Sequence, residues 1–297
     1  MIILFGFIMI IVFAVCIELI REQKNFTVTE YMIRDRKLDL YDKKTVVFLS
    51  DLHNHVYGKE NDELLESIRK IAPDYIFIGG DMLVGKDGCG FEPALNFVKQ
   101  LPQIAPVYYG NGNHEQRMKE EPEEYSVSFV KYQQELLKAG VHFLENESAV
   151  FNWNNTKVRL TGLEIPRRCY KHFKKEALYQ EEIVERIGKS KTEFYEILLA
   201  HNPSYMDKYL EWGADLTLSG HLHGGLVRIP GVAGAISPSF EIFPKYSGDH
   251  YQNGEQQIVV SKGLGMHTFK IRLLNPAEVV VLSFRGDASC EKVENPV

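Results

Sequence analysis

The chain has 297 residues, of which 44% are hydrophobic and 25% charged, a composition typical of a globular protein with one large core. Its formal net charge of −6 argues against nucleic acid as a partner. The four cysteines are scattered without a CxxC pair, which argues against both a zinc knuckle and a disulfide framework.

The first predicted element is an apolar helix at residues 1–20. Only Glu18 interrupts this stretch, which as a helix would be roughly 26 to 30 Å long, about the thickness of a hydrocarbon core. A cleaved signal peptide is the alternative, but neither a basic leader nor a small-residue cleavage site is evident. We therefore predict an uncleaved, single-pass membrane anchor.

The charge distribution around this stretch predicts its orientation. No Lys or Arg precedes it, whereas several follow it: Arg21, Lys24, Arg34, Arg36 and Lys37. By the positive-inside rule, this bias places the rest of the chain on the cytoplasmic side of the cell membrane.

The segment 21–44 is polar and mixed in charge, and its residues 26–33 have the β-branched and aromatic side chains of an edge strand. Three apolar runs follow, at 45–49, 75–78 and 105–109, and each predicts a buried strand. Apolar residues at helical spacing predict helices near 59–71, 91–101 and 123–139.

The second half of the chain continues the alternation. Residues 149–152 and 157–163 predict a hairpin. Further strands are predicted at 194–200, 215–219, 256–261 and 277–284, and helices near 176–187 and 203–211. Residues 224–255 contain many Gly and Pro residues without a clear period, which indicates a long loop of the kind that is often functional. Together these elements predict a layered α/β architecture.

Polar residues of metal-ligand type follow five of the predicted strands: Asp51, Asp81, Asn113, His201 and His221. Ligands of α/β sheets bind at this edge. His223 lies two residues beyond His221, so in extended backbone both imidazoles point to the same side. Each residue alone also fits a helix cap, a turn or a core histidine. We prefer the joint interpretation because all five strand ends carry such residues.

These blocks resemble the motifs of the calcineurin-like metallophosphoesterase family. The matching stretches are Asp51-Leu52-His53, Gly80-Asp81, Gly112-Asn113-His114-Glu115, His201 and Gly220-His221-Leu222-His223. The resemblance implies a four-layer sandwich, with two β-sheets flanked by helices, preceded here by one transmembrane helix. We assign residues 45–285 to this metallophosphoesterase domain and expect residues 286–297 to be a loose tail.

The resemblance also implies two divalent metal ions bridged by Asp81. One ion would be held by Asp51, His53, Asp81 and His223. The other would be held by Asp81, Asn113, His201 and His221. This mixed nitrogen and oxygen set suits Mn, Fe, Zn or Ni.

Two such ions, about 3.5 to 4 Å apart, can clamp a phosphoryl group and ionise a bridging water, and that hydroxide would attack phosphorus in line. His114 follows a ligand directly and is the best candidate to stabilise the transition state or to protonate the leaving oxygen. Glu115 is the candidate to orient His114.

Further stretches resemble the YkuE/YaeI-type branch, which is related to UDP-2,3-diacylglucosamine pyrophosphatases. They include His221-Leu222-His223-Gly224-Gly225, Phe243-Pro244-Lys245-Tyr246 and Ser261-Lys262-Gly263-Leu264-Gly265. The chain departs from this branch at Leu226, where Gln is common. The resemblance implies a phosphodiester or pyrophosphate substrate, either a small molecule or lipid-linked. Arg228 and Arg272 could each grip its phosphate bidentately, and surface ion pairs are the alternative.

The sequence therefore predicts a membrane-anchored, dinuclear metallophosphoesterase that interacts with the membrane through its N-terminal helix and not with nucleic acid. It leaves the oligomeric state open. The rival interpretation is a non-catalytic metal-binding interaction module on the same fold. Such a module would be expected to lose ligands, and all seven positions are intact here.

Overall fold

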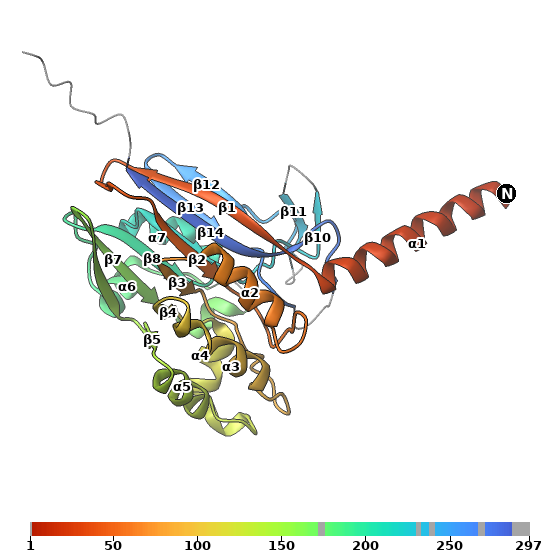
Figure 1. Cartoon of the computed structure of the whole chain (residues 1–297), viewed down its shortest axis with the longest axis horizontal. Helices are drawn as coiled ribbons and strands as arrows, with labels where there is room; N and C mark the ends of the chain where they lie inside the picture. The colour runs from red at the N-terminus through yellow and green to blue at the C-terminus, as the bar shows by residue number, and fades with distance from the viewer. Residues whose placement is uncertain (1, 172–175, 230–232, 238–240, 267–270, 287–297) are drawn as a thin grey trace, which may run out of the picture.

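Two six-stranded β-sheets pack face to face, and helices cover the outer face of each sheet (Figure 1). The computed structural model describes residues 2–171, 176–229, 233–237, 241–266 and 271–286. The order of layers is helix, sheet, sheet, helix, which confirms the four-layer sandwich implied by the sequence. The predicted tail at 287–297 lies outside the described residues.

The first sheet has the strand order β1-β14-β2-β3-β4-β5. Its strands are β1 (Phe26–Asp35), β2 (Lys44–Leu49), β3 (Tyr75–Ile78), β4 (Val107–Tyr109), β5 (Val141–Phe143) and β14 (Ala277–Gly286). The four strands from β2 to β5 are mutually parallel. β1 lies at the edge and pairs in parallel with β14, so the predicted edge strand is confirmed.

The second sheet has the order β12-β13-β9-β8-β7-β6. Its strands are β6 (Ser148–Trp153), β7 (Thr156–Leu163), β8 (Tyr195–Ala200), β9 (Leu216–Ser219), β12 (Asp249–Asn253) and β13 (Gln256–Val260). β7, β8, β9 and β13 are parallel, so the carboxyl ends of β8 and β9 lie at one edge of the sheet. A separate antiparallel pair is formed by β10 (Val227–Ile229) and β11 (Ala233–Ile236).

One helix precedes the strands, and the others lie in the connections between them. They are α1 (Ile2–Lys24), α2 (Asp62–Ile71), α3 (Glu92–Val98), α4 (Asn113–Glu120), α5 (Phe129–Lys138), α6 (Gln180–Ile187) and α7 (Met206–Trp212). Short 3-10 turns are η1 (Leu101–Gln103), η2 (Pro122–Glu124), η3 (Arg167–Tyr170) and η4 (Pro203–Tyr205).

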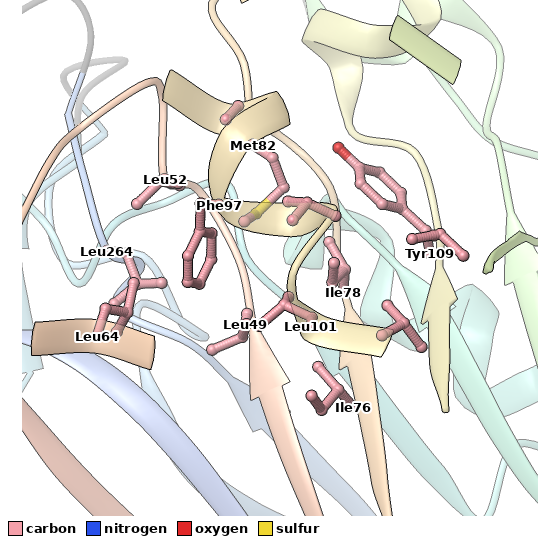
Figure 2. Close-up of a cluster of buried hydrophobic side chains, with 14 of the residues drawn as sticks. Leu49, Leu52, Leu64, Ile76, Ile78, Met82, Phe97, Leu101, Tyr109 and Leu264 are labelled. Carbon is pink, nitrogen blue, oxygen red and sulfur yellow. The ribbon is translucent and has the colours of Figure 1, made fainter. Parts of the chain in front are cut away.

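Alternating side chains of the strands divide the core into three clusters. From β2, Phe48 faces the second sheet, whereas Leu49 faces the helices. Figure 2 shows the helix side of the first sheet, where Leu49 and Ile76 belong to the same buried cluster as Phe97 of α3. A third cluster lies between the second sheet and α6 and α7. The sheets are therefore buried on both faces, as their near-continuous apolar sequences require.

The structure differs from the predicted local structure in three places. The loop predicted at 224–255 contains β10, β11 and β12, which have only three to five residues each and are too short to show a period. The sequence did not predict β5 or α4. Helix α4 begins at Asn113, within a motif interpreted as a strand end, and its outward face carries polar residues.

The N-terminal helix α1 projects away from the sandwich (Figure 1). Its residues Ile3–Lys24 have a mean hydropathy of 3.0 over the most apolar window, and none of that window is buried in the protein. By length and composition this helix could cross a membrane. Its apolar side chains otherwise face solvent, which is costly in water.

Candidate metal centre

The polar residues predicted to act together lie at one edge of the two sheets. Asp51 and Asp81 follow β2 and β3, and Asn113 begins α4 after β4. His201 follows β8, and the segment with His221 and His223 follows β9. Because these strands are parallel within each sheet, their carboxyl ends meet, and side chains from both sheets enter one small volume.

One half of the centre is formed by Asp51, His53 and His223, whose ligand atoms lie within 4.8 Å of one another. The Nε2 atoms of His53 and His223 are 3.3 Å apart. They lie 3.8 Å and 3.6 Å, respectively, from Asp51 Oδ1. All three side chains are buried, so this geometry gives a closed site for one cation.

The other half is organised around Asp81. Its Oδ2 lies 3.0 Å from Nε2 of His201 and 3.9 Å from Nε2 of both His53 and His114. His221 completes a cluster with Asp81 and His201 within the same 4.8 Å limit. Asp81 therefore contacts both halves, which is the arrangement required of a bridging carboxylate.

The hydrogen bonds of the imidazoles determine which nitrogen can bind a metal. Nδ1 of His201 lies 2.7 Å from the Gly79 carbonyl, and Nδ1 of His223 lies 3.0 Å from the Gly265 carbonyl. A carbonyl only accepts, so both Nδ1 atoms carry the proton. In a neutral ring the unprotonated Nε2 then points at the carboxylates, as metal-ligating imidazoles require.

His114 has the opposite arrangement. Its Nδ1 accepts a hydrogen bond from the Gly85 N–H at 2.8 Å, so a neutral ring carries its proton on Nε2. That Nε2 faces Asp81 at 3.9 Å. In this tautomer His114 presents an N–H to Asp81, although His53, Asp81 and His114 also form a group whose ligand atoms lie within 4.8 Å of one another.

Asn113 fits its predicted role for another reason. Its amide oxygen is buried and has no hydrogen-bond partner among the described residues. Leaving such an acceptor unpaired costs about 1–3 kcal/mol, which coordination of a cation would remove. With the His and Asp clusters, this orphaned oxygen shows that the residues present can hold divalent metal ions.

Five of the seven predicted ligands have a left-handed backbone. Asp51, His53, Asp81, His221 and His223 have φ between 48° and 71°. Each such residue costs about 1–3 kcal/mol and persists only where its surroundings enforce it. Glycines permit the close approach here, since a Cβ on Gly112 would collide with Asp81, and one on Gly220 would collide with Asp51.

A family model of the calcineurin-like phosphoesterases matches residues 44–225, more than half of the chain. The chain belongs to the calcineurin-like phosphoesterase family. It is therefore a hydrolase that acts on phosphoric esters, and its strand-end residues form the candidate metal centre of that fold.

Relatives of this calcineurin-like phosphoesterase include the uncharacterized protein YpbG of Bacillus subtilis. The two are 30% identical over 250 residues, which are 82% of this chain and 81% of YpbG. The phosphodiesterase YaeI of Escherichia coli is 26% identical over 242 residues, 80% of each chain. The uncharacterized metallophosphoesterase YkuE of B. subtilis is 34% identical over 92 residues, 31% of this chain and 32% of YkuE. The resemblance to the YkuE/YaeI branch is confirmed.

The buried acids and imidazoles of the phosphoesterase centre shift one another's pKa values. Burial raises the pKa of Asp51 to about 6, although the imidazole of His201 opposes this shift. Burial would also raise the pKa of Asp81, but the imidazoles of His201 and His114 hold it well below its usual range. Burial lowers the pKa of His201, but Asp81 and Asp51 outweigh it and raise this pKa to about 10. Two buried carboxylates thus need positive charge between them.

Glu115 has a different role from the one predicted. We expected it to orient His114, but the Gly85 N–H holds that ring. The fully buried Glu115 carboxylate instead accepts hydrogen bonds from the backbone N–H groups of Asp81 and Met82, each at 2.8 Å, and from the Tyr109 hydroxyl at 2.7 Å. Glu115 therefore fixes the backbone of the bridging ligand.

The two arginines predicted to grip phosphate make other contacts. Arg228 pairs with Asp249. Arg272 donates to the carbonyls of Lys262, Gly263 and Gly265 at 2.8 to 3.1 Å. The Gly265 carbonyl also accepts from the His223 ring, so Arg272 helps to hold this predicted ligand in place through that carbonyl.

The sequence reasoning missed Asn275 and Glu22. Asn275 is buried and donates its amide to the carbonyls of His223 and Gly225, at 2.7 Å and 2.6 Å. Its backbone N–H donates to both carboxylate oxygens of Glu22, at 2.9 and 3.0 Å. The available signal was an acid, Glu22, in the last turn of a largely apolar helix that also carries Glu18. The contacts connect the end of α1 to the segment that carries a ligand.

Proposed function

We propose that the chain is a membrane-anchored, dinuclear phosphodiesterase that cleaves a lipid-linked phosphodiester or pyrophosphate at the cytoplasmic face of the membrane. The observation that carries the proposal is the division of imidazoles around Asp81. In the neutral rings, Nδ1 of His201 carries the proton and leaves its Nε2, 3.0 Å from Asp81, free to bind a metal, whereas Nε2 of His114, 3.9 Å from Asp81, carries the proton. One carboxylate thus adjoins both a metal-binding group and a proton donor.

The seven ligand positions divide between two ions. Asp51, His53 and His223 serve one ion, and Asn113, His201 and His221 serve the other, with Asp81 shared. When bound, two divalent ions supply the positive charge that holds a phosphoryl group and that favours ionisation of water. The positive charge also compensates the buried Asp51 and Asp81.

His114 completes the site as the proton donor. Its Nε2–H faces the volume between the clusters, and the Gly85 N–H keeps the ring in that tautomer. A leaving alkoxide needs a proton in the transition state, and a positioned imidazole supplies it. Retention of this donor beside an intact ligand set favours catalysis over the non-catalytic module.

The surroundings favour a substrate with two substituents, one of them apolar. A cavity of about 110 Å³ is lined by His55, Gly265 and Met266, beside the half of the centre with His53 and His223. A second cavity of about 90 Å³ is lined by Pro203 and Leu222, beside the half with His201 and His221. We assign one of the two ester substituents of a phosphodiester to each cavity. The first cavity also contacts Glu22 at the end of α1, which favours a lipid-linked group there.

The test is hydrolysis of bis(p-nitrophenyl) phosphate by the full-length protein with added Mn²⁺, together with a count of bound metal. Asp81→Asn should lower the rate roughly a thousandfold, because it removes a preorganised charge from both ions. Asp42→Asn, at an exposed position, is the matched control and should leave the rate of hydrolysis unchanged. A wild-type protein that binds metal without turnover would favour the interaction module. A near-normal rate with two metals in Asp81→Asn would refute the site.

The orientation has its own test. Protease added to intact cells should leave the folded domain uncut, because the charge bias after residue 20 places it inside. Removal of the domain from intact cells would refute the cytoplasmic placement.

A further inference from the structure

The small sheet of β10 and β11 has an apolar outer face. An isolated bridge joins Val227 to Leu273 in parallel, and another joins Ile236 to Ile242. Directly paired residues of neighbouring strands point to the same side of a sheet. These pairings, with the strand alternation in β10, place five apolar residues together: Val227, Ile229, Ile236, Ile242 and Leu273. We call this group the apolar face.

The opposite side of the same segments is charged and buried. Arg228 lies between Val227 and Ile229, and Arg272 precedes Leu273; these arginines are only 8% and 2% exposed. By contrast, Ile242 is 72% exposed, Ile229 41% and Ile236 37%. A sheet with one solvated face normally turns its apolar side chains inward and its charges outward. This inversion indicates that the apolar face meets an apolar partner.

The structure also indicates which partner this is. The segment that contributes Leu273 continues to Asn275, whose backbone N–H binds Glu22 in the last turn of α1. Figure 1 shows α1 leaving the body beside β10 and β11. The most apolar window of this helix is unburied, and only its last turns carry charged residues. The environment that covers α1 therefore reaches the edge of the apolar face.

We propose that the apolar face rests in the surface of the lipid bilayer and holds the metal centre against it; the inference rests on the proposed membrane anchoring by α1. Its energetic source is burial of apolar side chains at the boundary between headgroups and acyl chains. Its consequence for the reaction follows from Arg272, which adjoins Leu273 and supports His223 through the Gly265 carbonyl. A lipid phosphoester can reach the centre without leaving the membrane surface.

Lipid contact is measured directly with tryptophan. Ile229→Trp is introduced into the full-length protein, which is reconstituted in phosphatidylcholine vesicles with or without brominated acyl chains. The native Trp153 and Trp212 are buried and give a constant background. The control is Leu137→Trp on α5, at a position 50% exposed and remote from α1 in Figure 1. We expect bromine to quench the new tryptophan at 229 and not the one at 137. Equal quenching, or none at 229, would overturn the proposal.

A second measurement connects the contact to function. The double variant Ile229→Glu with Ile236→Glu should lose roughly tenfold in kcat/KM on a phosphodiester embedded in vesicles, because charged side chains oppose burial in lipid. Its rate on water-soluble bis(p-nitrophenyl) phosphate should not change. Val130→Glu with Leu137→Glu on α5 is the matched control and should affect neither rate. Equal losses on both substrates would refute the proposal, since they would report damage to the fold.

Two further results separate the alternatives. Wild-type protein that is absent from membranes would refute the proposed anchoring itself. If the wild-type protein is membrane-bound and active but the new tryptophan of Ile229→Trp is not quenched, only the apolar face as a lipid contact is refuted. Dimers in detergent that the double glutamate variant dissociates, again without lipid quenching, would assign the apolar face to a second copy of the chain.

Discussion

Replacement of Asn275 tests how the fold holds a metal ligand. The Asn275 side chain donates to the carbonyls of His223 and Gly225, which flank the left-handed turn after the second histidine of the HxH motif. Asn275→Ala removes both donors. It leaves the backbone N–H that binds Glu22, so the perturbation is confined to the ligand segment.

The expected magnitude follows from these contacts. Each buried carbonyl that loses its donor costs about 1–3 kcal/mol, so two cost about 2–6 kcal/mol if nothing relaxes. His223 is itself held at a φ of 52°, and the segment can recover part of this cost by abandoning that conformation. Relaxation moves the imidazole away from Asp51. Because loss of a partner that orients a ligand typically weakens metal binding 10–100-fold, we expect a change of about that size.

Calorimetric titration of chelator-treated, full-length protein with Mn²⁺ measures this affinity without reference to catalysis. Asn253→Ala, at an exposed position, is the matched control and should bind metal like the wild type. Saturating Mn²⁺ should restore most of kcat in Asn275→Ala, because the ligand itself remains. Wild-type affinity in Asn275→Ala would refute the reasoning. So would a loss of kcat that metal cannot restore.

Three other predictions use different measurements. His114→Ala should retain both metals. Its rate of hydrolysis should fall roughly a hundredfold or more on alkyl phosphodiesters but far less on p-nitrophenyl esters, because their leaving group needs no proton. Loss of metal from this variant would refute the role of His114 as proton donor. Glu196→Gln should lower the free energy of unfolding in denaturant by about 3–5 kcal/mol, because it breaks the buried, bidentate pair with Arg159, and an unchanged midpoint would contradict this. Chelation should lower the melting temperature, since a metal at roughly a hundred times its Kd stabilises the native state by about 2.7 kcal/mol; an unchanged value would show that the native state binds no metal.

The strands that position the site were predictable because their information is local. The run before Asp51 and the run before Asp81 are short, apolar and followed by polar residues. The carboxyl ends of parallel strands meet, so the order of these runs along the chain was enough to bring their side chains together. The family resemblance then implies the ligand set, and two residue groups able to hold a metal fall within it: Asp51, His53 and His223, and Asp81, His201 and His221.

The supporting contacts were not predictable, because they join segments far apart in the chain. Glu22 and Asn275 are separated by 253 positions, and no periodicity relates them. The arginines were misleading for a related reason. Arg228 and Arg272 lie in apolar surroundings in the sequence, and only the pairing of β10 with Leu273 shows that the arginines face inward. Composition alone favours the opposite orientation.

The left-handed ligands imply that the protein organises the centre before metal arrives. A metal alone would draw flexible ligands together, and it would not require five strained residues. Here the strain is enforced by contacts with no metal in them, such as the Glu115 carboxylate on the Asp81 N–H and the Asn275 amide on the His223 carbonyl. Ligands held at fixed positions cannot contract around whichever ion binds. In the proposed dinuclear centre, the fold would then set the distance between the two ions, and a phosphoryl group would meet a charge distribution that needs little rearrangement in the transition state.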